Sequence, residues 1–413
     1  MKHLFVAGLM TIPVALGSPP AYADCGIESG SIRILANDFP ALRTFTGVAA
    51  ECESDTVEFV LNHTAEHSNI AVAAMTPDPP EYTARILATS TLVTMMNEDL
   101  VQPMDELVEK YGDGLTPMQL IEIDGNIMSV AFMANTQHLI YRADILDAAG
   151  LEVPTTVEEV IEASRVIREK GLMENPFAAA YKAGWNLGEE FVNMFLGHGG
   201  EFFKAGTALP NLNNEIGVAA LTKMKGLTEY MNPDYLTLES EGIKLEWEAG
   251  NVALMFLWAS RAPTLLDDKG STPEVVAATT LAAPVTVSGG DIPVASLWWD
   301  GFSIAKNASD ENAEASFRAL VRGAVSKGMA NEHSDEAVWL IEGFVPGPKS
   351  IGVIEAVKMN ARPYPMIASM GLLHAALGEE IVEFLQGQES VEQALSDVEA
   401  AYMAKAKEAG FID

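Results

Sequence analysis

Four tryptophans stand where their chemistry could serve binding. Trp258 follows an apolar run, and Trp185 lies in a short segment between a glycine and an asparagine. Trp298 and Trp299 directly precede Asp300 and a glycine. An indole ring offers a flat apolar face, and a carboxylate beside it exchanges directional hydrogen bonds with hydroxyl groups. This combination suits a ligand such as a sugar, whereas core packing is the alternative reading for any single ring.

Polar side chains that follow predicted strands are further candidates for ligand contact. Asn37 and Asp38 follow the first strand, Asn97 and Glu98 follow the apolar run 92–96, and Arg261 comes three residues after Trp258. Turns favour Asn and Asp for conformational reasons as well. Among all polar candidates, the carboxylate at position 300 is the strongest because an aromatic residue and a glycine flank it.

Catalytic and metal-binding patterns are weak by comparison. His63, Glu66 and His67 share a spacing that would put the histidines on one helical face, but their order is not that of a zinc protease motif. A solvated helix face is the preferred interpretation, and no third ligand is apparent. The sequence has no nucleophile elbow and no phosphate-binding loop. Paired carboxylates for glycoside hydrolysis remain an open alternative among so many acids. We expect no cofactor and no metal.

The charge balance excludes several partner classes. The 413 residues include 58 acidic and 25 Lys or Arg residues, which gives a formal net charge of −33. Nucleic-acid binding requires Lys and Arg to neutralise phosphates, so this class is not expected. Anionic membrane surfaces are disfavoured for the same reason. With 48% hydrophobic and 20% charged residues, the chain has enough apolar matter for a sizeable core.

The first 23 residues have the pattern of a secretory signal peptide. Lys2 supplies the positive start, an apolar stretch covers 4–16, and the Ala21-Tyr22-Ala23 sequence matches a cleavage site. The apolar stretch is too short for a membrane anchor. We therefore expect cleavage after Ala23, a periplasmic location and no membrane insertion.

Two cysteines, Cys25 and Cys52, are the only ones in the chain. An even number in an oxidising compartment favours one disulfide bond between them, and two separate buried thiols are the alternative. Such a bridge would join the start of the exported chain to the first helical segment.

Alternating strands and helices predict an α/β fold, in which ligands gather at the carboxyl ends of strands. An Asp124-Gly125 pair predicts the turn of a hairpin, Gly150 the end of a helix, and Thr156 with Glu159 a capping box at the start of another. Predicted strands cover 31–36, 70–74, 121–127 as a hairpin, 129–133, 139–142 and 252–257, with an apolar crossing segment at 294–304. Predicted helices cover the region up to 50, a segment from about 81, and 144–149, 157–170, 313–325, 368–385 and 391–409.

Three groups of sequence stretches carry a family resemblance. The first consists of LVQPMDE at 100–106, DGNIMSVAF at 124–132, NT at 135–136, LIYRAD at 139–144, AGL at 149–151 and PTT at 154–156; the others are WEAGNVALM at 247–255 and PGPKS at 346–350. Together they resemble the family 1 extracellular solute-binding proteins of bacterial ABC importers, which are maltose-binding-protein-like carbohydrate binders. The chain departs from that pattern at Ala131, where the family usually has proline, and in the longer region 41–67.

The resemblance implies a two-lobed periplasmic-binding-protein fold, each lobe a central sheet flanked by helices, with solute held between the lobes and hinge closure. One lobe would comprise 24–132 plus about 300–346, and the other 133–299 plus about 347–413. Crossings would lie near 132–135, 297–301 and 345–348. The resemblance also places Asn135 at a hydrogen-bonding position, Trp258 at a stacking position, and one of Trp298 and Trp299 in the cleft, the other packing behind it.

It further implies a monomer that delivers a neutral mono- to oligosaccharide or sugar alcohol to the transmembrane subunits of an ABC permease. A cationic polyamine is the main alternative ligand, because tryptophan also binds cations through its ring face. Iron is disfavoured because the tyrosines are scattered, and a phosphorylated polyol because the expected cleft loops offer chiefly Arg261 and Lys182 as cations.

Overall fold

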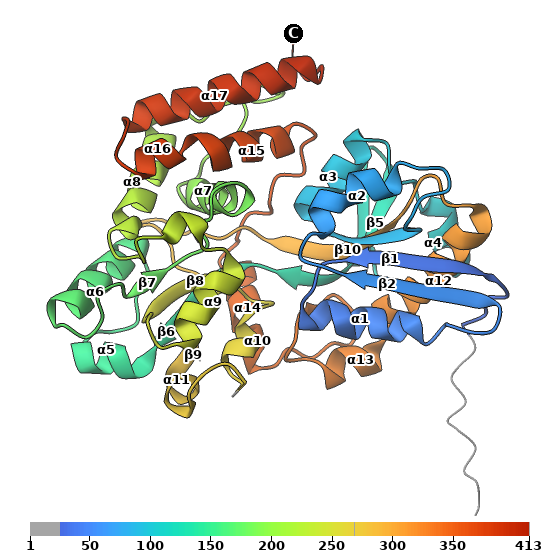
Figure 1. Ribbon diagram of the computed structural model, residues 1–413, viewed down its shortest axis with the longest axis horizontal. Coiled ribbons are helices and arrows are strands. Elements are labelled where there is room, and N and C mark those ends of the chain that lie inside the picture. Colours follow the sequence, from blue (N-terminus) through green and yellow to red (C-terminus); the bar gives the residue numbers. More distant parts are fainter. Residues whose placement is uncertain (1–24, 268, 413) are drawn as a thin grey trace, which may run out of the picture.

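The computed structural model describes residues 25–267 and 269–412. The predicted signal peptide and its cleavage site after Ala23 lie outside the described residues. The chain forms two α/β lobes side by side, with strand β10 running between them (Figure 1). The predicted two-lobed α/β fold is confirmed. Within the described residues, none of the helices is both long and apolar enough to cross a membrane.

The first lobe is built on a seven-stranded mixed sheet. Its order is β11-β5-β10-β3-β1-β2, with β4 paired to β5, and β1 runs parallel to β2 and β3 while β10 runs antiparallel to β3 and β5. The strands are β1 Gly30–Ala36, β2 Val57–His63, β3 Ala84–Ala88, β4 Leu120–Ile123, β5 Asn126–Asn135, β10 Trp298–Ile304 and β11 Val338–Trp339.

Helices cover both faces of this sheet because the strand side chains alternate between two apolar cores. Ile32 and Ile34 pack with α1 and α12 on one face, whereas Leu35 and Leu87 pack with α2 and α3 on the other. The helices of this lobe are α1 Pro40–Ala50, α2 His67–Met75, α3 Thr89–Asn97, α4 Asp105–Tyr111, α12 Asp310–Ala324 and α13 Lys327–Glu332, with a 3-10 turn at Pro117–Gln119.

The second lobe has a smaller sheet of order β7-β8-β6-β9. Its strands are β6 Gln137–Arg142, β7 Phe177–Ala178, β8 Leu254–Trp258 and β9 Thr279–Leu281. Its helices are α5 Ala143–Ala149, α6 Val157–Glu169, α7 Trp185–Gly197, α8 Glu215–Thr228, α9 Ser240–Glu248, α10 Ala262–Leu265, α11 Pro273–Ala278, α14 Ile351–Lys358, α15 Met370–Glu380, α16 Val382–Leu385 and α17 Val391–Glu408, with 3-10 turns at Tyr235–Thr237 and Pro348–Ser350.

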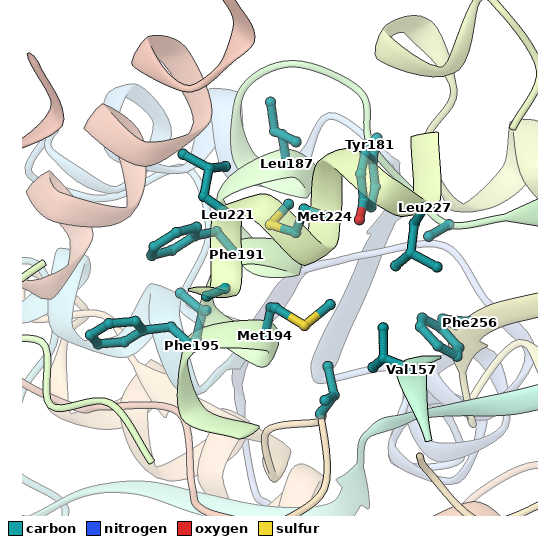
Figure 2. Close-up of a cluster of buried hydrophobic side chains, with 14 of the residues drawn as sticks. Val157, Tyr181, Leu187, Phe191, Met194, Phe195, Leu221, Met224, Leu227 and Phe256 are labelled. Atoms are coloured by element: carbon teal, nitrogen blue, oxygen red, sulfur yellow. The ribbon is translucent and has the colours of Figure 1, made fainter. Parts of the chain in front are cut away.

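Helix α7 is the buried centre of this second lobe. Phe191, Met194 and Phe195 on α7 pack against Leu221 and Met224 on α8, as Figure 2 shows. Helix α15 covers another side of α7, and α17 lies over α15 (Figure 1). A helix enclosed in this way has a rigid position, so the residues at its first turn have a fixed place beside the sheet.

Several local predictions are confirmed. Asp124 and Gly125 both have positive φ (52° and 80°) in the turn between β4 and β5, as a two-residue hairpin turn requires. Gly150 ends α5 with φ 68°. The Thr156 hydroxyl accepts from the Glu159 N–H at 3.2 Å, which completes the predicted capping box of α6.

Three predictions in the first lobe are wrong. The apolar run 70–74 lies in helix α2, the segment from about 81 leads into strand β3, and the run 92–96 lies in helix α3. Strand β2 was not predicted. Short apolar runs are compatible with a buried strand or a buried helix, and pairing of β3 with β1 and β10 decides between them only in the folded protein.

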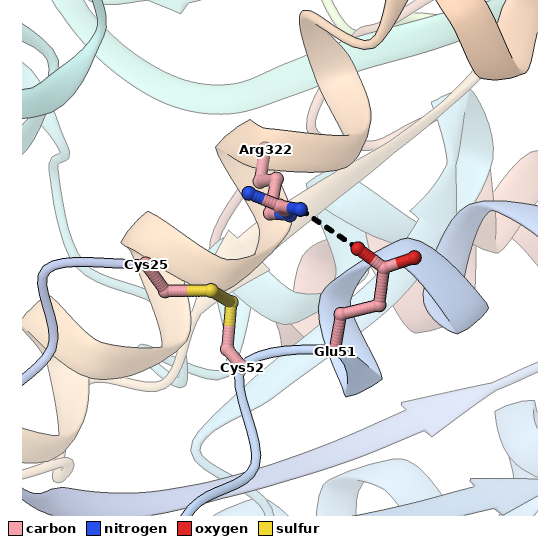
Figure 3. The surroundings of a disulfide bond; sticks show 4 residues. All are labelled: Cys25, Glu51, Cys52 and Arg322. Carbon is pink, nitrogen blue, oxygen red and sulfur yellow. Dashed lines mark hydrogen bonds and ion pairs between the residues drawn. A yellow bond between two sulfur atoms is a disulfide. The ribbon is translucent and has the colours of Figure 1, made fainter. Parts of the chain in front are cut away.

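Cys25 and Cys52 form a disulfide bond, as predicted. It joins the segment before β1 to the turn after α1 (Figure 3). Beside it, Arg322 on α12 pairs with Glu51 at 2.7 Å. The bridge and the ion pair together hold the start of the described chain against α1 and α12.

Removing this disulfide should destabilise the first lobe. The bridge spans 27 residues, and on the loop-entropy model its loss costs about 3.5 kcal/mol. We expect the Cys25→Ser/Cys52→Ser variant to unfold at lower urea concentration than the oxidised protein. Reducing agent should lower the midpoint of the wild type and leave that of the variant unchanged. Equal midpoints for the two oxidised proteins would contradict this prediction.

Candidate functional site

Three of the predicted tryptophans converge, although they are far apart in the sequence. Trp185 opens α7, Trp258 ends β8, and Trp298 begins β10. The ring centroids of Trp185 and Trp258 lie 6.4 Å apart with planes 29° from parallel. The Trp298 ring meets both edge-on, at 5.7 and 5.6 Å. Trp185 lies at the first turn of α7 rather than in a loop, which corrects the expected setting of this residue.

Tyr364 and His374 complete this aromatic cluster, and the sequence did not point to either. The Tyr364 ring lies 4.3 Å from Trp298, and the His374 ring 5.2 Å from Trp185. Tyr364 reaches the cluster because residue 297 pairs with residue 363 next to β10. No local sequence pattern predicts this pairing, since it depends on a contact between segments that are distant in the sequence.

His374 is neutral and has one defined tautomer. Burial lowers the pKa of His374 to about 4. Its Nε2 lies 2.8 Å from the carbonyl oxygen of Trp185, which can only accept, so Nε2 carries the proton. Nδ1 therefore accepts from the Tyr364 hydroxyl at 2.9 Å. This chain of hydrogen bonds ties α15 to the first residue of α7 and fixes the aromatic cluster.

Exposure differs strongly within the cluster. The Trp185 side chain is 44% exposed, Trp258 is partly buried, and Trp298 is only 4% exposed. Trp185 and Trp258 thus present the accessible ring surfaces, and Trp298 forms the base on which they rest. An arrangement of this kind can stack against the flat faces of a ligand.

A buried polar layer holds the base of the cluster. Trp298 Nε1 donates to Glu189 Oε1 at 3.0 Å and to Ser296 Oγ at 2.7 Å. The Ser296 N–H donates to Asn193 Oδ1 at 2.7 Å. Glu189 and Asn193 lie one turn apart on α7, and both bond to the segment leading into β10. These two side chains and Ser296 therefore join α7 to that segment below the aromatic rings.

Two neighbouring carboxyl groups in this layer keep their protons. Burial raises the pKa of Glu189 well above its usual range, and the adjacent Glu190 raises it further. Burial also raises the pKa of Glu190 to about 8, although Gln137 Nε2 donates to its Oε1 at 3.0 Å. Both groups are therefore mostly neutral at pH 7, and they can donate as well as accept.

Trp299 lies on the other side of the crossing strand from Trp298, and Asp300 follows it in the same strand. Trp299 packs against the core of the first lobe that includes α2 and α3, and its backbone N–H donates to Thr89 Oγ1 at 3.1 Å. Asp300 pairs with Ala88 and Met133, next to a bulge, and burial raises its pKa to about 7. Strand alternation thus brings Trp298, and not Trp299, into the aromatic cluster.

Asn135 lies at the end of β5, where it joins the two lobes. Its amide donates to Ser260 Oγ at 3.0 Å, and its carbonyl oxygen accepts from the Ser260 and Thr136 N–H groups at 3.2 and 3.0 Å. Register pairs Asn135 with Trp298. Much of its hydrogen-bonding capacity is therefore engaged within the protein.

The remaining predicted residues line the edge of the first lobe or reach across from the second. Asn37 Oδ1 accepts from the Asp38 N–H at 2.7 Å, and Asp38 pairs with Arg43 at 2.6 Å. The Arg261 guanidinium lies 5.8 Å from the Phe39 ring, which belongs to the other lobe.

Asn97 and Glu98 lie at the end of α3. Asn97 Nδ2 donates to the Ala368 carbonyl at 2.9 Å, across to the second lobe, and Glu98 is exposed. The structure thus brings the three tryptophans together, whereas Asn37, Asp38, Asn97 and Glu98 lie on the first lobe and Arg261 on the second.

The described residues offer few other places where chemistry could occur. A hollow of about 480 Å³ lies at the start of β8, the end opposite Trp258, and its lining includes Tyr235 and Glu246. His63 and His67 take separate partners, since His63 Nδ1 contacts the Asn37 carbonyl oxygen and His67 lies beside Arg85. Among the residues that the structure describes, no group of three or more His, Cys, Asp or Glu could hold a metal ion.

The neutral state of Glu190 predicts a pH-dependent stability. The folded state holds its proton up to about pH 8, whereas an unfolded glutamate releases it near 4.5. The free energy of unfolding should therefore fall as pH rises through this window, by at most about 1.4 kcal/mol per pH unit. Glu190→Gln has no carboxyl group to deprotonate, so it does not lose stability in this window. We therefore expect the difference in melting temperature, variant minus wild type, to increase from pH 5 to pH 8.

Glu392→Gln, at an exposed glutamate of α17, is the matched control for the loss of one carboxyl group. A constant difference between Glu190→Gln and wild type across the range would show that Glu190 is not protonated in the folded protein.

Comparison with solved structures shows the same architecture. The solute-binding protein of an Agrobacterium radiobacter K84 ABC transporter, solved with ribitol, superimposes with a TM-score of 0.79 at 19% identity over 92% of this chain and 99% of that chain. The T. maritima MalE3 protein with maltose gives 0.77 at 16% identity over 91% and 100%. The Agrobacterium vitis S4 solute-binding protein with D-mannitol gives 0.73 at 16% over 92% and 99%.

A search of curated protein sequences finds no match. The family model described as bacterial extracellular solute-binding protein, in contrast, matches residues 53–322, which is well over half of the chain. The family resemblance seen in the sequence is therefore confirmed. With its two lobes, its crossing strand and this match, the chain belongs to the bacterial extracellular solute-binding protein family.

Proposed function

We propose that this protein is the solute-binding component of an ABC importer and that it captures a neutral carbohydrate between its lobes. The ligand class is a mono- to oligosaccharide or a sugar alcohol. The observation that carries the proposal is the convergence of Trp185, Trp258 and Trp298 beside the crossing strand. The structural neighbours bound to ribitol, maltose and D-mannitol support the same ligand class.

The electrostatics below the cluster favour a neutral ligand over a cation. Glu189 and Glu190 hold their protons at neutral pH, so they place little negative charge beneath the rings. A polyamine would require carboxylates as counter-ions at this place. A sugar hydroxyl, in contrast, needs only polar groups that can donate or accept.

The proposed mechanism is non-covalent and assigns the protein no catalytic role. The accessible faces of Trp185 and Trp258 would stack on the sugar ring. Asp300 and Asn135 would bond hydroxyls from the crossing, with Asn37, Asp38, Asn97, Glu98 and Arg261 at the rim. Trp298 and Trp299 would support the site from opposite lobes. Hinge closure would then complete the binding site.

The lobes in this proposal comprise 24–132 plus about 300–346 and 133–299 plus about 347–413. The protein would act as a periplasmic monomer, released by signal-peptide cleavage after Ala23, and would deliver its ligand to the transmembrane subunits of the permease.

A thermal-shift panel tests the ligand class. Purified protein is mixed with ribitol, D-mannitol, maltose and spermidine, and a ligand that binds only the folded state raises the melting temperature. At 100 times its Kd such a ligand adds about 2.7 kcal/mol to the free energy of unfolding. A shift with a neutral sugar or polyol is the expected result. A shift with spermidine alone would overturn the ligand class, and no shift across a wider sugar panel would count against the proposal.

Alanine substitution tests the site. Trp185→Ala and Trp258→Ala should each weaken binding of the active panel ligand at least about tenfold, because each removes a stacking face. Melting temperatures should stay within a few degrees, since both rings are partly exposed. Leu245→Ala, at a 57% exposed apolar side chain of the same lobe, is the control for calorimetric titration. Unchanged affinity in both tryptophan variants would show that the ligand binds elsewhere.

A further inference from the structure

Arg85 is a buried cation that has no acidic partner. It lies in β3 and is only 2% exposed. Within residues 25–267 and 269–412, no carboxylate forms an ion pair with it, whereas most other arginines of this part of the chain are paired or lie near the surface. A buried charge without a counter-ion is strongly unfavourable, so its retention in a strand calls for an explanation.

The hydrogen-bonding demands of the Arg85 guanidinium are poorly met. Nε is buried and has no partner. Nη1 points to the Met95 sulfur on α3, and a thioether is a weak acceptor. Nη2 lies 3.5 Å from His67 Nδ1 and 3.4 Å from Ser68 Oγ, both near the limit of a hydrogen bond.

Among the described residues, the polar groups that contact this guanidinium carry no negative charge. Burial and the nearby Arg85 lower the pKa of His67 to about 3, so the imidazole is neutral. Glu66, the residue before α2, accepts from Asn69 Nδ2 at 2.5 Å and forms no ion pair with Arg85. The first turn of α2 contains no acidic residue. The His67 and Asn69 N–H groups of this turn donate to the Thr64 and Glu66 carbonyl oxygens, and the aligned peptide dipoles of the helix place a partial positive charge at this end, near Arg85.

The site lies at the edge of the sheet that faces the other lobe. Helix α2 begins four residues after β2 ends, at the carboxyl edge of the parallel strands β2, β1 and β3. The same edge carries Phe39, whose ring contacts the Arg261 guanidinium of the second lobe, and Ala88, which pairs with Asp300 in β10. Ser68 is exposed, so its hydroxyl connects the buried guanidinium to solvent.

We propose that Arg85, with Ser68 at the start of α2, forms a binding site for an oxyanion. Phosphate, sulfate and carboxylate share the required chemistry, because the planar guanidinium offers paired N–H donors that match two oxygens. The oxyanion comes either as a free inorganic ion or as the acid group of a solute held between the lobes. This site is separate from the aromatic cluster and goes beyond the proposed carbohydrate function.

Thermal-shift titration at low ionic strength tests the site with inorganic phosphate, with gluconate, and with D-mannitol as the neutral counterpart of gluconate. We expect phosphate or gluconate to raise the melting temperature of the wild type in a concentration-dependent manner, and Arg85→Met to lose this shift. Without added oxyanion, Arg85→Met should melt at or above the wild-type temperature, because an apolar side chain replaces an unpaired buried charge.

Arg43→Gln is the matched control, since Arg43 lies on the same lobe at the surface and its loss changes the net charge by the same amount. It should keep the full anion response. If Arg85→Met fails to fold, Arg85→Lys serves instead, and it should bind phosphate or gluconate at least about tenfold more weakly because it lacks the paired donors.

The outcomes separate the possible sources of the anion. A phosphate response that depends on Arg85 identifies a free inorganic ion, and a gluconate response without one to phosphate identifies the acid group of a solute. An anion response equal in wild type and Arg85 variants, or none at all, overturns the proposal. The response to D-mannitol is scored in the same experiment, so failure of the sugar-binding function is recognised independently.

Discussion

The pairing of β5 with β10 is the constraint on which the architecture of this protein depends. β5 ends at Asn135 and the chain enters β6 of the second lobe two residues later, while β10 begins at Trp298 and runs into the sheet of the first lobe. Both crossings are therefore held in one antiparallel register. Breaking backbone hydrogen bonds of this kind in a buried setting is costly, so the two crossing segments stay adjacent where the chain passes between the lobes.

This register also determines which lobe each side chain of the crossing strand faces. Since side chains alternate along a strand, Trp298 enters the core of the second lobe and Trp299 the core of the first. The Trp298 ring then needs a partner for its buried N–H, and Glu189 on α7 supplies it. A charged carboxylate in that position would be costly, which explains why the group keeps its proton and why the layer below the rings is polar but nearly neutral.

Sequence patterns pointed to the aromatic cluster better than to the polar groups around it. Trp185, Trp258 and Trp298 each stand next to an element that short-range patterns identify, such as the apolar run before position 258. Tyr364 and His374 join them only through the pairing of residues 297 and 363 and the packing of α15 on α7. The errors in the first lobe have the same origin, because the 70–74 and 92–96 runs take their structure from the sheet that they cover. Arg85 was overlooked because the strand that buries it was predicted as a helix.

The net charge of the whole protein does not describe the local charge on the two sides of the interlobe region. The protein carries a formal charge of −33, yet the acids nearest the aromatic cluster are protonated, and the first lobe holds, near its facing edge, a buried cation, Arg85, for which the described residues supply no carboxylate partner. Surface acids are largely screened by salt beyond about 10 Å, whereas buried groups are not. The local field between the lobes is thus set by a few buried side chains. A solute that combines a flat hydroxylated ring with an acid group would match both sides at once, whereas a neutral sugar would leave Arg85 without a counter-ion.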